Sequence, residues 1–294
     1  MITGASGLVG SALIPYLGKR GHDVCAIVRS VKPLGAATIR WDPEKGFIDY
    51  RDVSDVDVII HLSGENIGEG RWTKEKKEKI LVSRVHSTNF LAQILASLER
   101  KPRLLLSASA VGFYGSQGNA ILTEKSPKGS GFLSDVCEKW EGAADPARRA
   151  GIRTCFARFG MILSPKGGAL KSLLPPFKYG MGGKIGSGRQ WWSWIALEDV
   201  CSALAHLIET PELEGAINVV SPFPVTNLEF TKTLGSVLHR PTLMPLPAPL
   251  ARLAFGEMAD ELMLASQRAI PDKLIATSFT FRYPRLEDAL KVML

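Results

Sequence analysis

Three glycines close to the start of the chain have the spacing of loops that bind phosphate groups. Gly4, Gly7 and Gly10 follow a short apolar stretch and lead into an apolar helical pattern. In this spacing the first glycine makes a tight turn, the second lets the backbone approach a pyrophosphate, and the third lets the helix pack closely on the sheet. The start of that helix also favours an anion through its N–H groups and its dipole. The pattern predicts a dinucleotide site, rather than an unrelated glycine-rich turn, that also involves Ser6, Leu8 and Val9.

The residues after the second predicted strand, 24–28, indicate which dinucleotide is preferred. NAD sites usually have an Asp or Glu at this point, which accepts a hydrogen bond from the ribose 2′-hydroxyl. Here the strand is followed by Arg29 and Ser30, with Lys32 close behind. A guanidinium can bind a 2′-phosphate with two N–H groups, and a serine hydroxyl can donate to it. We therefore expect NADP(H) to be the cofactor; a solvent-exposed arginine without a ligand is the alternative.

Two further apolar runs end in polar residues. The run 56–62 is almost continuously apolar, which is typical of a strand buried on both faces. Ligands bind at the carboxyl edge of a parallel sheet. We therefore expect the adenosine and its ribose to lie beside His61, Leu62, Ser63 and Gly64. No His or Cys lies at ligand spacing from His61, so no metal site is predicted.

The second run, 103–110, brings two serines to the same edge. Ser109 is expected near the nicotinamide, with Ser107 one pleat away. Tyr114 follows five residues beyond Ser109.

These residues need a particular set of elements to bring them together. A helix is predicted over about 73–98, where Arg84 interrupts the apolar stripe and either reaches the cofactor phosphates or forms a surface ion pair. Alternating strands and helices predict an α/β fold, a Rossmann doubly wound parallel sheet with a smaller, interleaved C-terminal substrate lobe. The NADP-binding domain would span 1–160 and receive about 195–221, with 161–294 supplying the lobe. Because few residues precede Gly4 in the first strand, we expect further apolar residues before Met1.

Composition excludes several other classes of protein. The net charge is +7, but glutamates interrupt the densest lysine run, 74–79, which is typical of a solvated helix face rather than a nucleic-acid site. Four isolated cysteines indicate a reducing compartment. No signal peptide opens the chain and no apolar run reaches about 18 residues, so we expect a cytoplasmic protein with no membrane partner. The glycines of 186–190 could offer N–H groups to a small anionic substrate.

Several segments together resemble a known family. The glycine loop, the segment 107–115 and 158–160 resemble extended short-chain dehydrogenases/reductases, the relatives of sugar-nucleotide epimerases. The segments 62–67, 71–72, 182–190 and 193–195 are similar to atypical "epimerase family" proteins, which include NADP-dependent oxidoreductases once described as cell-division inhibitors. The resemblance covers nearly the whole chain. It implies cofactor contacts at Gly4, Gly7, Gly10, Arg29, Leu62, Ser63 and Arg84, and backbone contacts on the nicotinamide side from Gly160 and Met161.

One part of the superfamily pattern is missing. The superfamily uses a Tyr-x-x-x-Lys pair on one helix face, where the tyrosine exchanges a proton with the substrate. The resemblance places Leu133 and Cys137 at those two positions, and neither can perform that role. Tyr114 is a candidate for a substitute acid, against a packed tyrosine bonded to backbone. Cys137 is either a nucleophile or a small buried hydrophobe.

Two functions therefore remain open. The first is an NADP(H)-dependent oxidoreductase or epimerase-like enzyme for a small molecule, in which Ser109 polarises a substrate carbonyl. The second is a non-catalytic NADPH-binding regulator or sensor.

Overall fold

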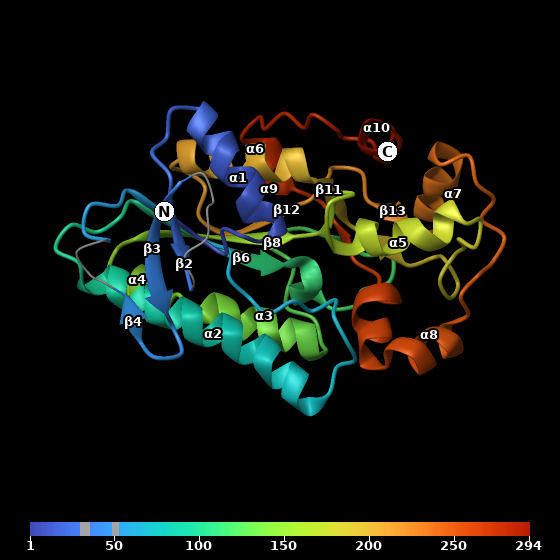
Figure 1. Ribbon diagram of the computed structural model, residues 1–294, viewed down its shortest axis with the longest axis horizontal. Coiled ribbons are helices and arrows are strands. Elements are labelled where there is room, and N and C mark those ends of the chain that lie inside the picture. The colour runs from blue at the N-terminus through green and yellow to red at the C-terminus, as the bar shows by residue number, and fades with distance from the viewer. Residues whose placement is uncertain (30–35, 49–52) are drawn as a thin grey trace.

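The computed structural model describes residues 1–29, 36–48 and 53–294 (Figure 1). Ser30 and Lys32, two of the predicted phosphate contacts, lie outside the described residues.

A parallel sheet forms the centre of the molecule. Within the described residues it has eight strands, in the order β12 (Gly215–Val219), β8 (Arg153–Phe159), β6 (Leu104–Ala110), β5 (Val58–His61), β1 (Ile2–Thr3), β2 (Cys25–Val28), β3 (Ala37–Asp42) and β4 (Phe47–Ile48). Every pair is parallel except β3 with β4. The chain runs outward from β1 through β2 and β3, and then crosses to β5 on the other side of β1. This reversal is the switch point at which doubly wound sheets bind ligands.

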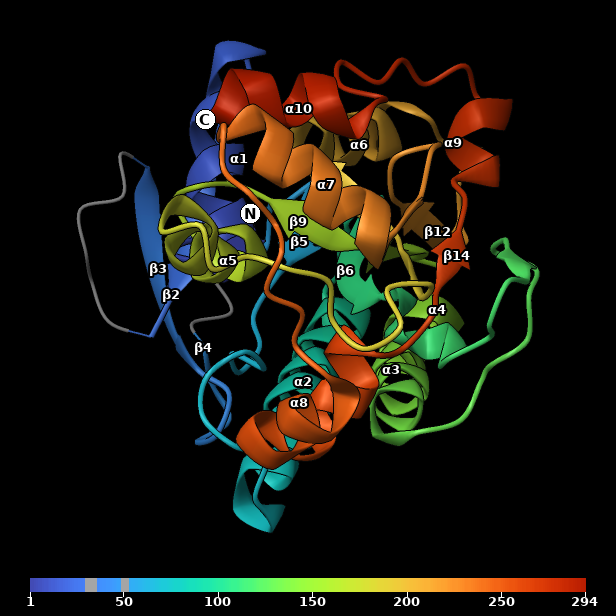
Figure 2. The same cartoon turned by 90° about the vertical axis from the view of Figure 1, so that its right-hand side faces the viewer.

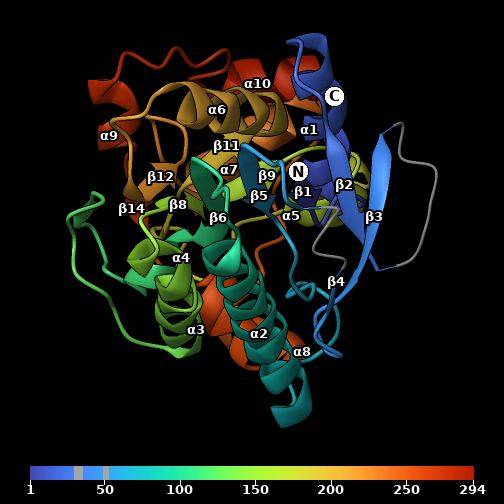
Figure 3. The ribbon, with the colours of Figure 1, turned by 90° about the vertical axis from the view of Figure 1, so that its left-hand side faces the viewer.

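Helices cover both faces of the sheet, as Figures 1 and 3 show. On one face α1 (Leu8–Lys19) packs beside α6 (Leu197–Glu209), and on the other lie α2 (Lys74–Ser97), α3 (Phe132–Gly142) and α4 (Asp145–Arg149). Each face has its own apolar core: Leu13, Leu17 and Leu204 belong to the first, and Ile59, Leu91 and Leu105 to the second. The predicted Rossmann α/β fold is confirmed.

Most of the remaining elements gather at one end of the sheet (Figures 1 and 2), whereas α9 (Asp272–Ala276) lies beside α6 and packs on β12. The chain passes repeatedly between the two parts, since β12 joins the main sheet by pairing with β8. The outlying elements are η2 (Val111–Tyr114), β7 (Ile121–Leu122), β9 (Met161–Leu163), α5 (Gly168–Lys178), β10 (Trp191–Trp192), β11 (Trp194–Ala196), β13 (Val225–Thr226), α7 (Asn227–Val237), α8 (Ala248–Phe255), η3 (Ala259–Met263), β14 (Arg268–Ala269), α9 (Asp272–Ala276) and α10 (Leu286–Met293).

The segment after residue 246 also holds one of the sheet helices in place. The carboxylate of Glu261 accepts hydrogen bonds from the backbone N–H groups of Phe132 and Leu133, at 3.0 and 3.1 Å. These are N–H groups in the first turn of α3, which the helix itself leaves unpaired. No helix in the described part of the chain combines the length and the apolar character that crossing a membrane requires.

Candidate functional site

The glycine loop connects β1 to α1 with little room for side chains. Gly4 has a φ of +66°, and a Cβ there would lie 2.6 Å from the carbonyl carbon of Leu62. At Gly10 a Cβ would collide with the carbonyl oxygen of Gly4 and lie 2.7 Å from Cα of Ala5. The loop closes with a hydrogen bond of 3.0 Å from Gly7 N to Gly4 O. A turn of this kind keeps the loop backbone bare on its outer side, which suits the approach of a bulky anion.

The start of α1 faces outward without a capping side chain. Its N-cap residue is Gly7, which has no side-chain cap, and the first turn contains no acidic residue. Ser6 and Gly7 are exposed, whereas Leu8 and Val9 are half-buried, Val9 against the apolar core and Leu8 beside Gly167. The positive end of the helix dipole is therefore available to an anion at this loop.

Strand register places the other predicted contacts beside this loop. Thr3 pairs with Ile27 of β2 on one side and with His61 of β5 on the other. Arg29 and Leu62 follow those two strands, so they flank Gly4 at the carboxyl edge of the sheet. Arg29 is exposed there. Arg29 thus lies one strand away from the glycine loop.

His61 does not face this edge as expected. It is fully buried, with Nδ1 at 2.7 Å from Thr3 Oγ1 and Nε2 at 3.1 Å from Ser87 Oγ. Thr3 Oγ1 also accepts from Leu62 N, and Ser87 Oγ donates to Ser83 O at 2.6 Å. These partners fit a neutral ring that carries its proton on Nε2. Burial lowers the pKa of His61 to about 3. Its role is to connect β1, β5 and α2.

The loop after β5 is held from behind by α2. Ser83 Oγ accepts from Glu65 N at 3.0 Å, and Arg84 Nη2 donates to Glu65 O at 3.0 Å. Arg84 also donates to Ile80 O, and its guanidinium lies 5.0 Å from the ring of Trp140. Burial lowers the pKa of Arg84. The guanidinium therefore lies behind the 62–65 segment, where it fixes the backbone.

Ser109 belongs to a buried polar chain. Its hydroxyl donates to Glu141 Oε1 at 2.7 Å, and Arg158 donates to both carboxylate oxygens of Glu141 at 2.8 Å. Arg158 Nη1 then donates to the hydroxyl of Tyr114 at 3.0 Å, which donates to Asn218 Oδ1 at 2.7 Å. Ser109 is only 2% exposed and Tyr114 is 0% exposed.

This chain corrects two expectations for the catalytic residues. A hydroxyl has one proton, and those of Ser109 and Tyr114 are already donated within the protein. Tyr114 is therefore not placed as a substitute acid, and its hydroxyl bonds to side chains rather than to backbone. In this arrangement Ser109 cannot polarise a carbonyl by donating to it. Ser107 is likewise 0% exposed within β6, so it does not reach the surface of the edge.

The two positions of the missing catalytic pair are apolar in character. Leu133 and Cys137 are both buried on α3, and Cys137 Sγ lies 3.7 Å from Ala110 O. Burial is the main cause that raises the pKa of the Cys137 thiol to about 12. A nucleophilic thiolate is therefore disfavoured there, and the cysteine packs as a small hydrophobe.

Three backbone N–H groups of the expected anion site at 186–190 have partners within the protein. The N–H group of Gly186 donates to Leu246 O, that of Gly188 to Ile185 O, and that of Arg189 to Ser187 Oγ. These donors are engaged within the protein and are not offered to a ligand. Gly160 and Met161 lie where β8 passes into β9, and Met161 N donates to Ser193 O.

Family models and relatives agree with this geometry. The model described as "NAD dependent epimerase/dehydratase family" matches residues 1–220, and a domain of unknown function, DUF1731, matches residues 246–293. Epimerase family protein Mb2239 of Mycobacterium bovis is 42% identical over 289 residues, which cover 98% of this chain and 95% of that protein.

This chain belongs to the NAD dependent epimerase/dehydratase family. Epimerase family protein YfhF of Bacillus subtilis is a further member, 37% identical over 100% of this chain and 97% of its own length. The crystal structure of human epimerase family protein SDR39U1 with NADPH has a TM-score of 0.88 and 31% identity, and covers 99% of this chain and 97% of that one. The predicted family resemblance is confirmed.

Some residues of the polar chain around Ser109 were not predicted from the sequence. Glu141 and Asn218 were not recognised as partners of Ser109 and Tyr114, although charged residues within buried elements usually have a partner. The contact of Glu261 with the first turn of α3 was missed too. Glu261 is 129 positions from Phe132 and 128 positions from Leu133 in the sequence.

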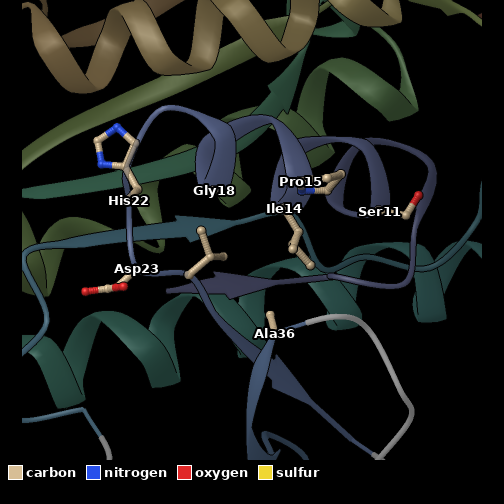
Figure 4. Close-up of a pocket in the computed structure, with 8 residues that line it drawn as sticks. Ser11, Ile14, Pro15, Gly18, His22, Asp23 and Ala36 are labelled. Carbon is tan, nitrogen blue, oxygen red and sulfur yellow. The ribbon is translucent and has the colours of Figure 1, made fainter.

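A separate pocket of about 330 Å³ lies away from this edge (Figure 4). It borders the outer side of α1 and the amino end of β2, whereas dinucleotides bind at the carboxyl ends of the strands. We therefore do not assign the cofactor to it. Its lining residues are Ser11, Ile14, Pro15, Gly18, His22, Asp23, Val24 and Ala36. Among the described residues, no group of three or more His, Cys, Asp or Glu side chains could hold a metal ion.

Proposed function

We propose that this chain binds NADP(H) across the carboxyl ends of β1, β2 and β5. The observation that carries the proposal is the tight glycine turn at Gly4 and Gly10, which packs on Leu62 and Ala5 and leaves the uncapped start of α1 at Gly7 exposed. Arg29 follows β2, where an NAD site would usually have a carboxylate. The similar human protein SDR39U1 was crystallised with NADPH. These features fit a dinucleotide with a 2′-phosphate.

The reaction that we propose is hydride exchange between NADP(H) and a small-molecule substrate, as in an oxidoreductase or an epimerase-like enzyme. The bound cofactor would supply the hydride chemistry. Ser109, whose proton is donated to Glu141, would accept a hydrogen bond from a substrate hydroxyl or N–H group, and solvent water would supply or take up the proton that accompanies hydride transfer.

A non-catalytic NADPH-binding regulator is the second candidate. One observation favours it: Ser109 and Tyr114 donate their protons within the protein, and Leu133 and Cys137 replace the usual proton-exchanging pair. A site without an available acid would bind the cofactor and leave the carbonyl unreduced.

A substrate screen separates the two functions. NADPH absorbance is followed with a panel of small aldehydes and ketones, and NADP⁺ reduction with the matching alcohols. The enzyme predicts turnover that Ser109→Ala abolishes, because that variant keeps the Glu141–Arg158 pair and loses the hydroxyl. Ser236→Ala, on the exposed side of α7, is the control and should retain turnover. Tight NADPH binding without turnover on any compound would contradict the enzyme and support the regulator.

A further inference from the structure

A carboxylate lies close to the position proposed for the adenosine phosphate. Glu65 follows β5 by four residues and Arg29 follows β2 by one, with β1 and Gly4 between them. Neighbouring strands are about 4.8 Å apart, so the ends of β2 and β5 lie about 10 Å from each other. A negative charge roughly this far from Arg29 would repel a phosphate dianion bound to it.

The backbone of Glu65 is fixed by two hydrogen bonds, so the loop cannot move the carboxylate away from the edge of the sheet. Its N–H group donates to Ser83 Oγ and its carbonyl accepts from Arg84, both at 3.0 Å. The carboxylate itself is 2.7 Å from Lys76 Nζ. The side chain of Lys76 is 16% exposed and that of Glu65 is 39% exposed, so the pair is partly shielded from water.

Nearby cationic side chains compensate this carboxylate. The hydrogen bond from Lys76 is the largest cause that lowers the pKa of Glu65, and the charges of Lys76, Lys79 and Arg29 also lower it. Arg29 is therefore close enough to Glu65 to interact with its charge. Without Lys76, Glu65 would compete with a phosphate for Arg29.

We propose that Lys76 strengthens the preference for a 2′-phosphate at Arg29, because its ion pair with Glu65 neutralises a carboxylate at the same edge of the sheet. The inference rests on the proposed NADP(H) site and concerns the selection between NADP(H) and NAD(H). Lys76 acts on the phosphate through Glu65, so it is a positioning residue rather than a catalytic one.

Calorimetry with NADP⁺ and NAD⁺ tests the inference through the ratio of the two dissociation constants. Lys76→Met leaves Glu65 uncompensated and should reduce the preference for NADP⁺ by about three- to tenfold, as expected for a dianion about 10 Å from one added charge. Glu65→Gln should increase the preference. The double variant Glu65→Gln/Lys76→Met should return the ratio to that of the wild type, because neither charge remains.

A neighbouring ion pair supplies the control. Lys77 is the next residue on α2 and pairs at 2.8 Å with Glu257 of the C-terminal lobe. Lys77→Met removes the same charge and should leave the ratio unchanged. Damage to the fold would weaken both dinucleotides in proportion, which the ratio does not register.

The possible outcomes distinguish the inference from the proposed function. A wild-type protein that prefers NADP⁺, with an unchanged ratio in Lys76→Met or no restoration in the double variant, would overturn the role of Lys76 alone. A folded wild-type protein that binds neither dinucleotide would overturn the NADP(H) site together with this inference.

Discussion

Individual side chains at this edge have roles that their sequence positions do not reveal. His61 ends a central strand, yet its ring faces inward and accepts from Thr3 while donating to Ser87. Ser109 lies one residue before the end of the next strand, and its hydroxyl donates to Glu141. Both residue types are common in catalytic sites, but a buried polar group needs partners within the fold. Here both ring nitrogens of His61 and the hydroxyl proton of Ser109 are already hydrogen-bonded to other residues of the protein.

The buried His61 predicts an acid sensitivity. Its pKa is about 3 in the folded protein and about 6.5 when unfolded, so between these values the unfolded chain binds a proton that the folded chain does not. The free energy of unfolding should fall as pH decreases below about 6.5, by up to about 1.4 kcal/mol per pH unit from this group. Urea unfolding between pH 4 and 7.5 should show a shallower decline for His61→Gln than for the wild type.

The same titration needs a histidine control. His86 is exposed on α2, and His86→Gln should follow the wild-type curve. Parallel curves for the wild type and His61→Gln would show that the ring is not held neutral in the folded protein.

At the scale of elements, the apolar patterns predict the main sheet well. The run 56–62 contains β5 and the run 103–110 contains β6, because strands buried on both faces need continuous apolar residues. The helix predicted over 73–98 is α2, Lys74–Ser97. These features depend on neighbours along the chain, which a single sequence displays.

The polar contacts of the site were not predictable in the same way. Ser109 and Glu141 are 32 positions apart, and Tyr114 and Asn218 are 104 positions apart. Such pairs form only when the strand order and register are known. In the loop 186–190 the N–H group of Gly186 is likewise used by Leu246 O from another segment.

The contact between α1 and the glycine loop predicts a contrast between two glycines of one helix. Gly10→Ala would push a Cβ into the backbone of Gly4 and Ala5, so it should destabilise the protein by about 1–3 kcal/mol and weaken NADP⁺ binding. At Gly18 a Cβ would have nothing within 4 Å. Gly18→Ala should therefore leave binding unchanged and stabilise α1 by up to about 1 kcal/mol. Urea unfolding and calorimetry measure both effects, and equal behaviour of the two variants would contradict this packing.

At the scale of the whole molecule, the two parts of the chain are joined by polar contacts at several points. Glu261 binds the first turn of α3, Asn218 connects Tyr114 of the sheet edge to Ile270 O, and Asp199 accepts from the N–H groups of Arg282 and Tyr283. The segment matched by DUF1731 thus holds the first turn of α3, the helix that carries Leu133 and Cys137. These contacts hold the sheet and the C-terminal segment together although the chain passes between them.

The central claim is that the loop 4–10 holds a diphosphate while Arg29 binds a 2′-phosphate. Calorimetry of the folded protein with NADP⁺ and NAD⁺, repeated on Arg29→Ala, tests it most directly. We predict that NADP⁺ binds one equivalent per chain and that Arg29→Ala weakens it by about ten- to hundredfold, the size of a charged hydrogen-bonded contact, with little change for NAD⁺. Absence of heat with both dinucleotides, or an equal loss for both in Arg29→Ala, would contradict the account.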